Sequence, residues 1–192
     1  MHIEKIELQN FRNYKNLELE FSKNVNLILG KNAQGKTNLL EAVYLTAIGR
    51  SFRTSKDLDL VKFNENNAIV KVWAEKELNN TTVEILIKRK GEKSSEKFIK
   101  KDRKNVNKTS QLLKNILIVI FSPEDLKIVK DEPEKRRKFI DRELSQISPK
   151  YYNSLSNYKK SLLQRNTYLK DDNLEPSIID LWDIQLAKYG AE

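Results

Sequence analysis

The first third of the chain alternates apolar and polar side chains in a way that predicts β-strands. Residues 6–9 (IELQ) and 17–21 (LELEF) have a period of two, which indicates two half-buried strands joined through residues 10–16. The short apolar run 25–29 (VNLIL) predicts a buried strand. From Thr37 the spacing becomes helical, and Gly49 stands where a left-handed glycine would end the helix. The apolar positions of this helix are Leu39, Leu40, Val43, Tyr44 and Ala47.

The middle of the chain continues with strand patterns. Residues 69–74 and 83–88 predict two further strands separated by a polar stretch. Phe98 and Val106 mark weaker strands on either side of a basic turn at 101–104. Residues 116–121 (ILIVIF) form a second uninterrupted apolar run and predict another buried strand.

After Phe121 the pattern becomes helical. Residues 122–125 (SPED) carry a capping serine, a proline at the first helical position and a carboxylate at the capping-box position, and Ser148-Pro149 repeats the device. The next apolar residues are heptad-like, which fits either a helix packed on a partner helix or an ordinary amphipathic helix. These residues are Tyr152, Leu155, Tyr158, Leu162 and Leu169. Another helix is expected from about Pro176.

Two lobes follow from these patterns. Residues 1–121 predict an α/β nucleotide-binding lobe with a mixed sheet, and residues 122–192 predict a helical lobe. The last residues, WDIQLAKYGAE, leave the final helix few places to pack, so we expect the helical lobe to be truncated and the chain to be a fragment.

Composition narrows the class of partner. The 192 residues include 36 Lys and Arg against 27 Asp and Glu, a net charge of +9, which favours a polyanion such as nucleotide or nucleic acid over a neutral ligand. A lysine-rich solvated surface would give the same count. The chain has no cysteine, no apolar run near the roughly 18 residues of a spanning helix, and no signal peptide at its start. We therefore expect a cytoplasmic location and no membrane partner.

The strongest motif lies between the run at 25–29 and the first helix. Residues 30–37 (GKNAQGKT) fit G-x-x-x-x-G-K-[ST] at every fixed position, and the predicted strand–loop–helix context is right for a P-loop. The glycines let backbone N–H groups turn toward phosphate oxygens, and the helix start adds its positive end. Lys36 supplies charge to the β- and γ-phosphates, and the hydroxyl of Thr37 suits Mg²⁺. The sequence therefore predicts binding of ATP with Mg²⁺ by Gly30, Lys31, Asn32, Ala33, Gln34, Gly35, Lys36 and Thr37.

The catalytic complement of a P-loop ATPase is less visible. A Walker B element needs an apolar strand that ends directly in Asp, often followed by Glu. Residues 116–121 are followed by Ser-Pro before Glu124 and Asp125, so the fit is poor, and we expect the true element outside these residues. The single histidine, His2, is expected to be a surface or strand residue. We predict no catalytic residue in this chain.

Two basic clusters could contact DNA phosphates. Residues 88–108 hold ten Lys or Arg against three Asp or Glu, and residues 135–138 read KRRK, including Arg136 and Arg137. Either cluster is also explained as a solvated face. Because only Phe98 and Phe139 lie near them in sequence, base stacking is not indicated. Arg50 and Arg53, just after the first helix, lie closer in sequence to the nucleotide, and we include them as candidate DNA contacts.

Several separate motifs resemble the bacterial RecF family. They are residues 6–14 (IELQNFRNY), the loop at 30–37, residues 49–54 (GRSFRT), residues 121–126 (FSPEDL) and residues 136–141 (RRKFID), and the similarity runs along the whole chain in the family's order. The resemblance implies an ABC-type ATPase head similar to those of SMC proteins. It also implies ATP-dependent homodimerisation, binding to DNA at gaps or single-strand/double-strand junctions, and work with RecO and RecR in loading recombinase.

The resemblance also assigns residues. Arg12 and Asn13 match the segment that reaches the nucleotide in such heads, and Glu124 or Asp125 lies where a Q-loop would sense the γ-phosphate or Mg²⁺. The family's signature motif, Walker B Asp-Glu and D-loop do not appear in this chain, which resembles the N-terminal half. We therefore expect it to bind ATP without efficient hydrolysis. Two other hypotheses stay open: a P-loop small-molecule kinase with a helical lid, and a DNA-binding module in which the P-loop is structural.

Overall fold

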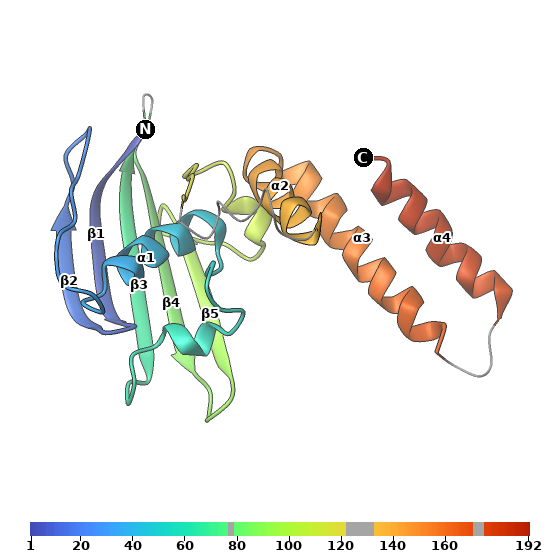
Figure 1. Cartoon of the computed structure of the whole chain (residues 1–192), viewed down its shortest axis with the longest axis horizontal. Helices are drawn as coiled ribbons and strands as arrows, with labels where there is room; N and C mark the ends of the chain where they lie inside the picture. Colours follow the sequence, from blue (N-terminus) through green and yellow to red (C-terminus); the bar gives the residue numbers. More distant parts are fainter. Residues whose placement is uncertain (77–78, 122–132, 171–174) are drawn as a thin grey trace. The chain divides into compact units, whose positions relative to one another are not determined.

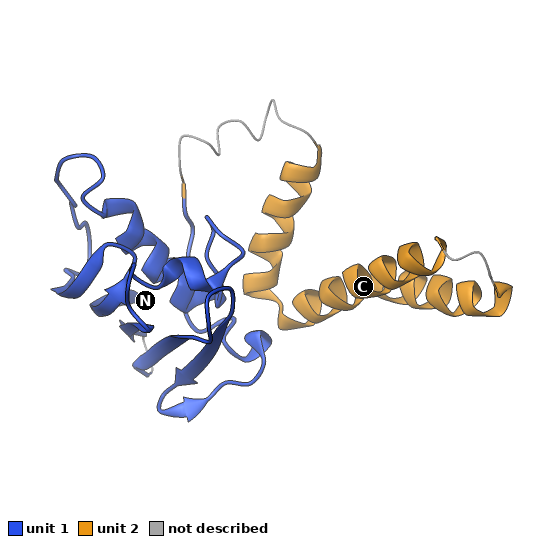
Figure 2. Cartoon of the chain, turned by 90° about the horizontal axis from the view of Figure 1, so that it is seen from below, with its two compact units in different colours: residues 1–120 blue, residues 121–192 orange. Residues whose placement is uncertain are grey.

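The chain folds into an antiparallel sheet with a buried helix, followed by a set of longer helices. The computed structural model describes residues 1–76, 79–121, 133–170 and 175–192. These residues form two compact units, Met1–Ile120 and Phe121–Glu192 (Figure 2). No helix among them is long and apolar enough to cross a membrane.

The first unit is built on a six-stranded sheet. Its order is β2-β1-β3-β4-β5-β6, and every pair is antiparallel. The strands are β1 (His2–Phe11), β2 (Tyr14–Glu20), β3 (Asn67–Glu75), β4 (Thr81–Arg89), β5 (Ser95–Lys101) and β6 (Lys104–Asn105), with two 3₁₀ turns, η1 (Asp57–Leu60) and η2 (Thr109–Gln111). The strands expected around 6–9, 17–21, 69–74, 83–88 and Phe98 all form at these places.

The core of the first unit lies between the sheet and helix α1 (Lys36–Ile48), which covers one sheet face (Figure 1). Burial alternates along β3 and β4, so that alternate side chains such as Val70, Val72, Val83 and Ile85 are fully buried against the helix. Gly49 ends the helix in the left-handed conformation expected from the sequence, with φ of 79° and its N–H bonded to the carbonyl of Leu45 at 2.7 Å.

Two expected strands are wrong. Residues 25–29 form no strand, and Leu27 and Leu29 are both 79% exposed. Residues 116–121 form none either: Ile116 is buried, yet Val119 is 81% exposed. An apolar run records a preference for burial, but a strand also needs a neighbour to bond its N–H and C=O groups. No described strand pairs with either run.

The second unit contains α2 (Pro133–Ile147), α3 (Pro149–Tyr168) and α4 (Pro176–Gly190). Ser148 caps α3 as its sequence predicts, its hydroxyl accepting from the N–H of Tyr151 at 3.2 Å. Helix α3 packs against both α2 and α4. Across the α3–α4 contact, Arg165 donates to Asp183 at 2.6 Å. Of the two interpretations left open, packing on partner helices is the one found. The helix start expected at 122–125 lies outside the described residues.

Candidate nucleotide-binding site

The P-loop residues form an exposed turn that leads into the first helix. Residues 30–34 are exposed, and α1 begins at Lys36, with Gly35 as its N-cap. Three backbone positions in this loop have positive φ values, Gly30 at 154°, Ala33 at 63° and Gly35 at 107°. Such reversals let successive N–H groups of a loop face one anion, which is how P-loops hold phosphate.

The side chain of Lys36 folds back over the loop. Its ammonium donates to the carbonyls of Gly30 at 2.5 Å and Lys31 at 2.7 Å. The charge is therefore held at the mouth of the loop by two neutral acceptors rather than by a carboxylate. A phosphate oxygen, being anionic, is a stronger acceptor than either carbonyl. The next residue, Thr37, is exposed in the first turn of the helix.

Position 35 requires glycine because of its neighbours as well as because of its φ. A Cβ at this position would lie 2.8 Å from Asn13 Oδ1 and 2.8 Å from the hydroxyl of Tyr14. Asn13 Oδ1 also accepts from Asn38 Nδ2 at 2.8 Å, and Lys62 donates to the Asn13 carbonyl at 2.9 Å. The turn between β1 and β2 is thus packed directly against the start of the P-loop helix.

Glu41, on the next turn of α1, is the centre of a buried polar network that the sequence did not reveal. Its carboxylate is fully buried and receives both arms of Arg12, from Nη2 at 2.6 Å and Nε at 2.9 Å. Ser51 donates to it at 2.5 Å, and Arg53 at 3.2 Å. Arg53 also donates to Asn38 at 2.7 Å. One sequence feature could have indicated this network: Glu41 is a single acid within the apolar segment 39–48. A charge buried in such a segment requires cations paired with it.

The electrostatics of Glu41 balance burial against charge pairing. Burial by itself raises the pKa of the carboxyl, but hydrogen bonds from Arg12 and Ser51 and the charges of Arg12 and Arg53 outweigh it, so the pKa is lowered. The carboxylate is therefore ionised at neutral pH. Two guanidinium groups on one carboxylate leave a positive surplus beside the first turns of the P-loop helix.

These residues fit ATP with Mg²⁺. Gly30 has open space where a Cβ would be, residues 30–34 are accessible, and the helix start and Lys36 supply positive charge. Thr37 offers an accessible hydroxyl of the kind that Mg²⁺ takes. The loop from Gly30 to Thr37 would hold the phosphates, and Mg²⁺ would supply charge neutralisation there.

The other predicted site residues are distributed differently. Arg12 and Asn13 both adjoin α1, Asn13 at Gly35 and Arg12 through Glu41. Arg53 belongs to the same network, and Arg50 is exposed nearby in sequence. Arg136 and Arg137 are exposed on α2 in the second unit. Glu124 and Asp125 lie outside the described residues.

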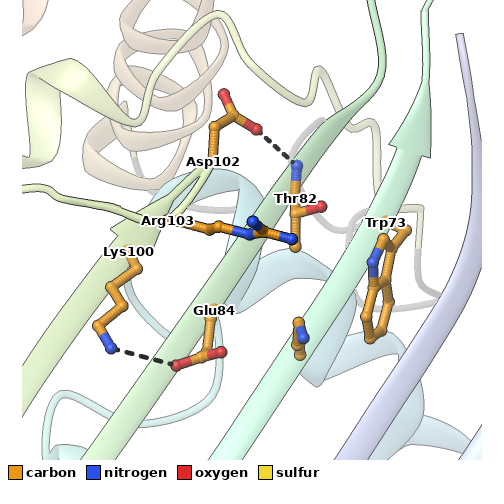
Figure 3. A pocket seen from close by; sticks show the side chains of 7 residues that line it. Trp73, Thr82, Glu84, Lys100, Asp102 and Arg103 are labelled. Carbon is orange, nitrogen blue, oxygen red and sulfur yellow. Dashed lines mark hydrogen bonds and ion pairs between the residues drawn. The ribbon is translucent and has the colours of Figure 1, made fainter.

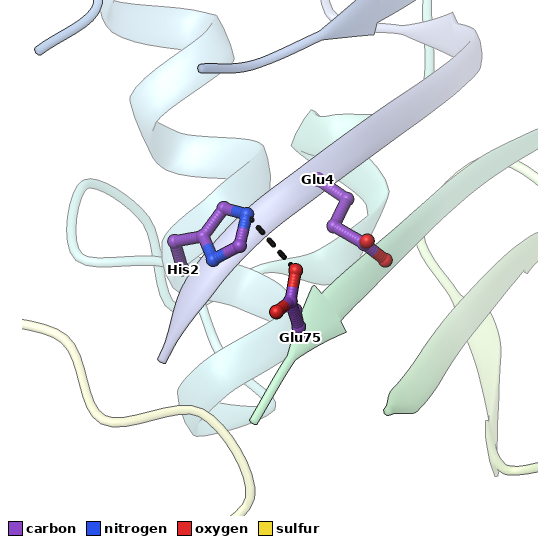
Figure 4. A group of neighbouring side chains, drawn as sticks. All are labelled: His2, Glu4 and Glu75. Carbon is purple, nitrogen blue, oxygen red and sulfur yellow. Dashed lines mark ion pairs between the residues drawn. The ribbon is translucent and has the colours of Figure 1, made fainter. Parts of the chain in front are cut away.

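His2 lies in a strand, within a small surface group of charged side chains (Figure 4). Its Nε2 is 3.5 Å from Glu75 Oε2, and Glu4 has a carboxylate oxygen within 4.8 Å of both ligand atoms. Lys23 already pairs with the other oxygen of Glu75 at 3.4 Å. The group is adequately explained as a partly exposed ion-pair cluster.

Comparison with known proteins gives one consistent result. The family described as AAA domain matches residues 5–188. The protein named "DNA replication and repair protein RecF" of Clostridium tetani is 47% identical over 192 residues, and that of Clostridioides difficile 44% over 191. Each alignment covers 100% of this chain and 51% or 50% of the relative, so the chain spans about half the length of the relatives it matches.

Solved structures agree. A structure described as the recombination mediator protein RecF-ATPrS in the RecFOR pathway superposes with a TM-score of 0.92 at 40% identity, and its RecF-ATP counterpart with 0.90 at 40%. Each match covers 99% of this chain and 51% of the other. The expected fold class, an ABC-type ATPase α/β lobe followed by helices, is confirmed.

Proposed function

Since this chain belongs to the AAA domain family, and within it to the RecF proteins, we propose that it is the ATP·Mg²⁺-binding part of a RecF-type DNA repair and recombination ATPase. The observation that carries this proposal is the loop Gly30–Thr37, exposed at the start of α1 with Lys36 folded over its mouth. Two similar structures, described as RecF-ATPrS and RecF-ATP, support the choice of nucleotide.

The proposal extends to what the whole protein does. It binds DNA at gaps or single-strand/double-strand junctions, dimerises when ATP is bound, and works in the cytoplasm with RecO and RecR to load recombinase. The net charge of +9 and the exposed Arg50, Arg136 and Arg137 support a polyanionic partner. The present residues bind ATP without efficient turnover, because a signature motif and a Walker B Asp-Glu pair are absent from their sequence.

The test is a calorimetric titration of ATP·Mg²⁺ into the chain and into Lys36→Ala. We expect saturable binding to the wild type and its loss in the variant, because Lys36 supplies the ammonium that lies at the mouth of the loop. Lys15→Ala, an exposed lysine on β2, is the matched control and should bind as the wild type does.

Three results would count against the proposal. Equal binding by Lys36→Ala and wild type would mean that nucleotide binds elsewhere. A phosphorylated small-molecule product would indicate a P-loop kinase instead. Rapid ATP hydrolysis abolished by Lys36→Ala would overturn the statement that these residues lack efficient turnover.

A further inference from the structure

The solvent-facing side of the sheet, opposite α1, carries a hollow lined by charged and aromatic side chains (Figure 3). Its volume is about 500 Å³, within the range of small-ligand sites. Three adjacent strands and one turn supply its lining. The residues are Lys71 and Trp73 from β3, Thr82 and Glu84 from β4, Lys100 from β5, and Asp102 and Arg103 from the β5–β6 turn.

The fold adds a second aromatic ring, Trp73, to a basic cluster whose own sequence contains only Phe98. Trp73 on β3 pairs with Thr82 on β4, and Glu84 on β4 pairs with Lys100 on β5. Only β4 therefore separates Trp73 from β5, which belongs to the basic segment 88–108. From the sequence alone, that segment had only Phe98 nearby. Strand pairing from β3 through β4 to β5 brings the two groups together, which their separation in the sequence does not reveal.

Cations at this hollow are in excess of their carboxylate partners. Within the described part of the chain, neither Lys71 nor Arg103 forms an ion pair, and Lys71 instead places its ammonium 4.4 Å from the centre of the Trp73 ring. Lys5 approaches the same ring at 5.1 Å. Lys100 has only a long contact of 3.9 Å with Glu84. Lys5 is held by Glu7 at 2.8 Å and Glu18 at 2.5 Å, so Lys71 is the ammonium beside the indole ring that an incoming anion can pair with.

The turn that carries Arg103 is held in place. Asp102 and Arg103 both have left-handed φ, 49° and 66°, between the paired residues Lys101 and Lys104, as in a two-residue type I′ turn. Asp102 Oδ1 accepts from the N–H of Thr82 at 2.8 Å, which anchors the turn on β4. Arginine is an uncommon residue in this conformation, and here it is directed across Thr82 toward Trp73 (Figure 3).

Positive charge also accumulates at this end of the sheet. Burial is the main cause that lowers the pKa of Lys76; the charge of Lys101 lowers it further and that of Asp102 raises it. The segment 100–104 adds Lys100, Lys101, Arg103 and Lys104 against the single acid Asp102, whose oxygen is engaged by Thr82. A flat aromatic face surrounded by cations is the arrangement that holds single-stranded nucleic acid, whose bases stack while phosphates pair.

We propose that this hollow is a binding site for single-stranded DNA, in which an unpaired base stacks on Trp73 and neighbouring phosphates contact Lys71, Lys100 and Arg103. The proposal rests on the proposed function for taking DNA as the polyanion. Its lining residues include none of the P-loop and none of the DNA-contact candidates named from the sequence. It selects unpaired bases, because a paired base in a duplex does not offer its face to a ring.

The experiment measures binding of a fluorescent oligothymidylate by anisotropy across a salt series. We expect Trp73→Ala to weaken binding about five- to hundredfold, the usual loss for one stacked base. Trp73→Phe should retain most of the affinity. Arg103→Ala should reduce the slope of log affinity against log salt by about 0.7, the value for one phosphate contact on a single strand.

Two controls and one direct signal accompany these variants. Phe63→Ala removes an exposed ring from a loop, and Lys160→Ala removes an exposed cation from α3; both should bind as the wild type does. Trp73 is one of two tryptophans, the other being Trp182 on α4. Stacking should therefore quench fluorescence in Trp182→Phe and leave Trp73→Phe unquenched.

Each of the following results would overturn the proposed binding site. Unchanged affinity in Trp73→Ala would remove the stacking contact. Equal affinity for duplex of the same length, or equal competition by an acidic peptide, would indicate a general anion surface. No oligothymidylate binding by the wild type would also sink the site. In that case ATP·Mg²⁺ binding lost in Lys36→Ala would leave the nucleotide part of the proposed function standing.

Discussion

Replacement of Glu41 by glutamine is the sharpest test of the network beside the P-loop. The change keeps the shape of the side chain but removes its charge and turns one acceptor oxygen into an NH₂ donor. That donor would face the donating groups of Arg12, which now approach at 2.6 and 2.9 Å. The variant therefore leaves two guanidinium groups beside a neutral, fully buried amide.

The structure sets the size of the effect. Breaking a buried pair by removing one partner costs about 3–5 kcal/mol of unfolding free energy. Here the carboxylate side chain is 0% exposed, but the side chains of Arg12 and Arg53 are 19% and 44% exposed, so water recovers part of their solvation. We expect a loss of about 2–3 kcal/mol of unfolding free energy, which is below that range because both arginines keep part of their hydration.

The pH dependence has a definite sign. Burial raises the pKa of Glu41, yet pairing with Arg12, Ser51 and Arg53 lowers it overall, so the folded-state pKa lies below the unfolded value of about 4.3. A lowered pKa contributes stability that is present above the unfolded pKa and lost as pH falls through the folded pKa. The stability gap between wild type and Glu41→Gln should therefore be constant from about pH 5 to 7 and narrow below about pH 4.

The assay is urea unfolding followed by the fluorescence of Trp73, in a background where Trp182→Phe removes the signal of the helical unit. Glu7→Gln is the matched control, because Glu7 pairs with Lys5 at 2.8 Å with its side chain 39% exposed. It should cost less than about 1 kcal/mol. A loss below about 1 kcal/mol in Glu41→Gln, or a gap that does not narrow in acid, would refute the buried ion pair.

Two further predictions concern the loop and the exposed apolar runs. Gly35→Ala should weaken ATP·Mg²⁺ binding in calorimetry, because the new Cβ would lie 2.8 Å from Asn13 Oδ1. Gly91→Ala is the control: Gly91 has φ of 80° but open space around its Cβ position, so the change should lower the unfolding free energy by only about 1–2 kcal/mol and leave ATP binding intact. Leu27→Ser combined with Val119→Ser should lower self-association in sedimentation velocity without reducing stability, because both side chains are about four-fifths exposed; unchanged association would show that these runs are not the contact.

Elements that depend on local pattern were predictable. Helix α1 was located from the spacing of its apolar residues and from Gly49, and α3 from Ser148-Pro149, because caps and helical periodicity act over a few neighbouring residues. The runs at 25–29 and 116–121 were not, since their apolar character is satisfied only by a pairing strand. Hydrophobicity identifies what a segment would bury, and the partner must be supplied by other residues.

The candidate site likewise has a part that could be predicted from local sequence and a part that could not. The P-loop could be read from the sequence because one contiguous octapeptide contains nearly all of its chemistry. The network around Glu41 could not, since Arg12 lies 29 positions before it and Arg53 12 positions after it. What joins them is the packing of the β1–β2 turn on α1, which places Asn13 against Gly35. It follows that Arg12 supports the loop through the position of this turn, so Arg12→Ala should disturb nucleotide binding and stability together, whereas Lys36→Ala should affect nucleotide binding alone.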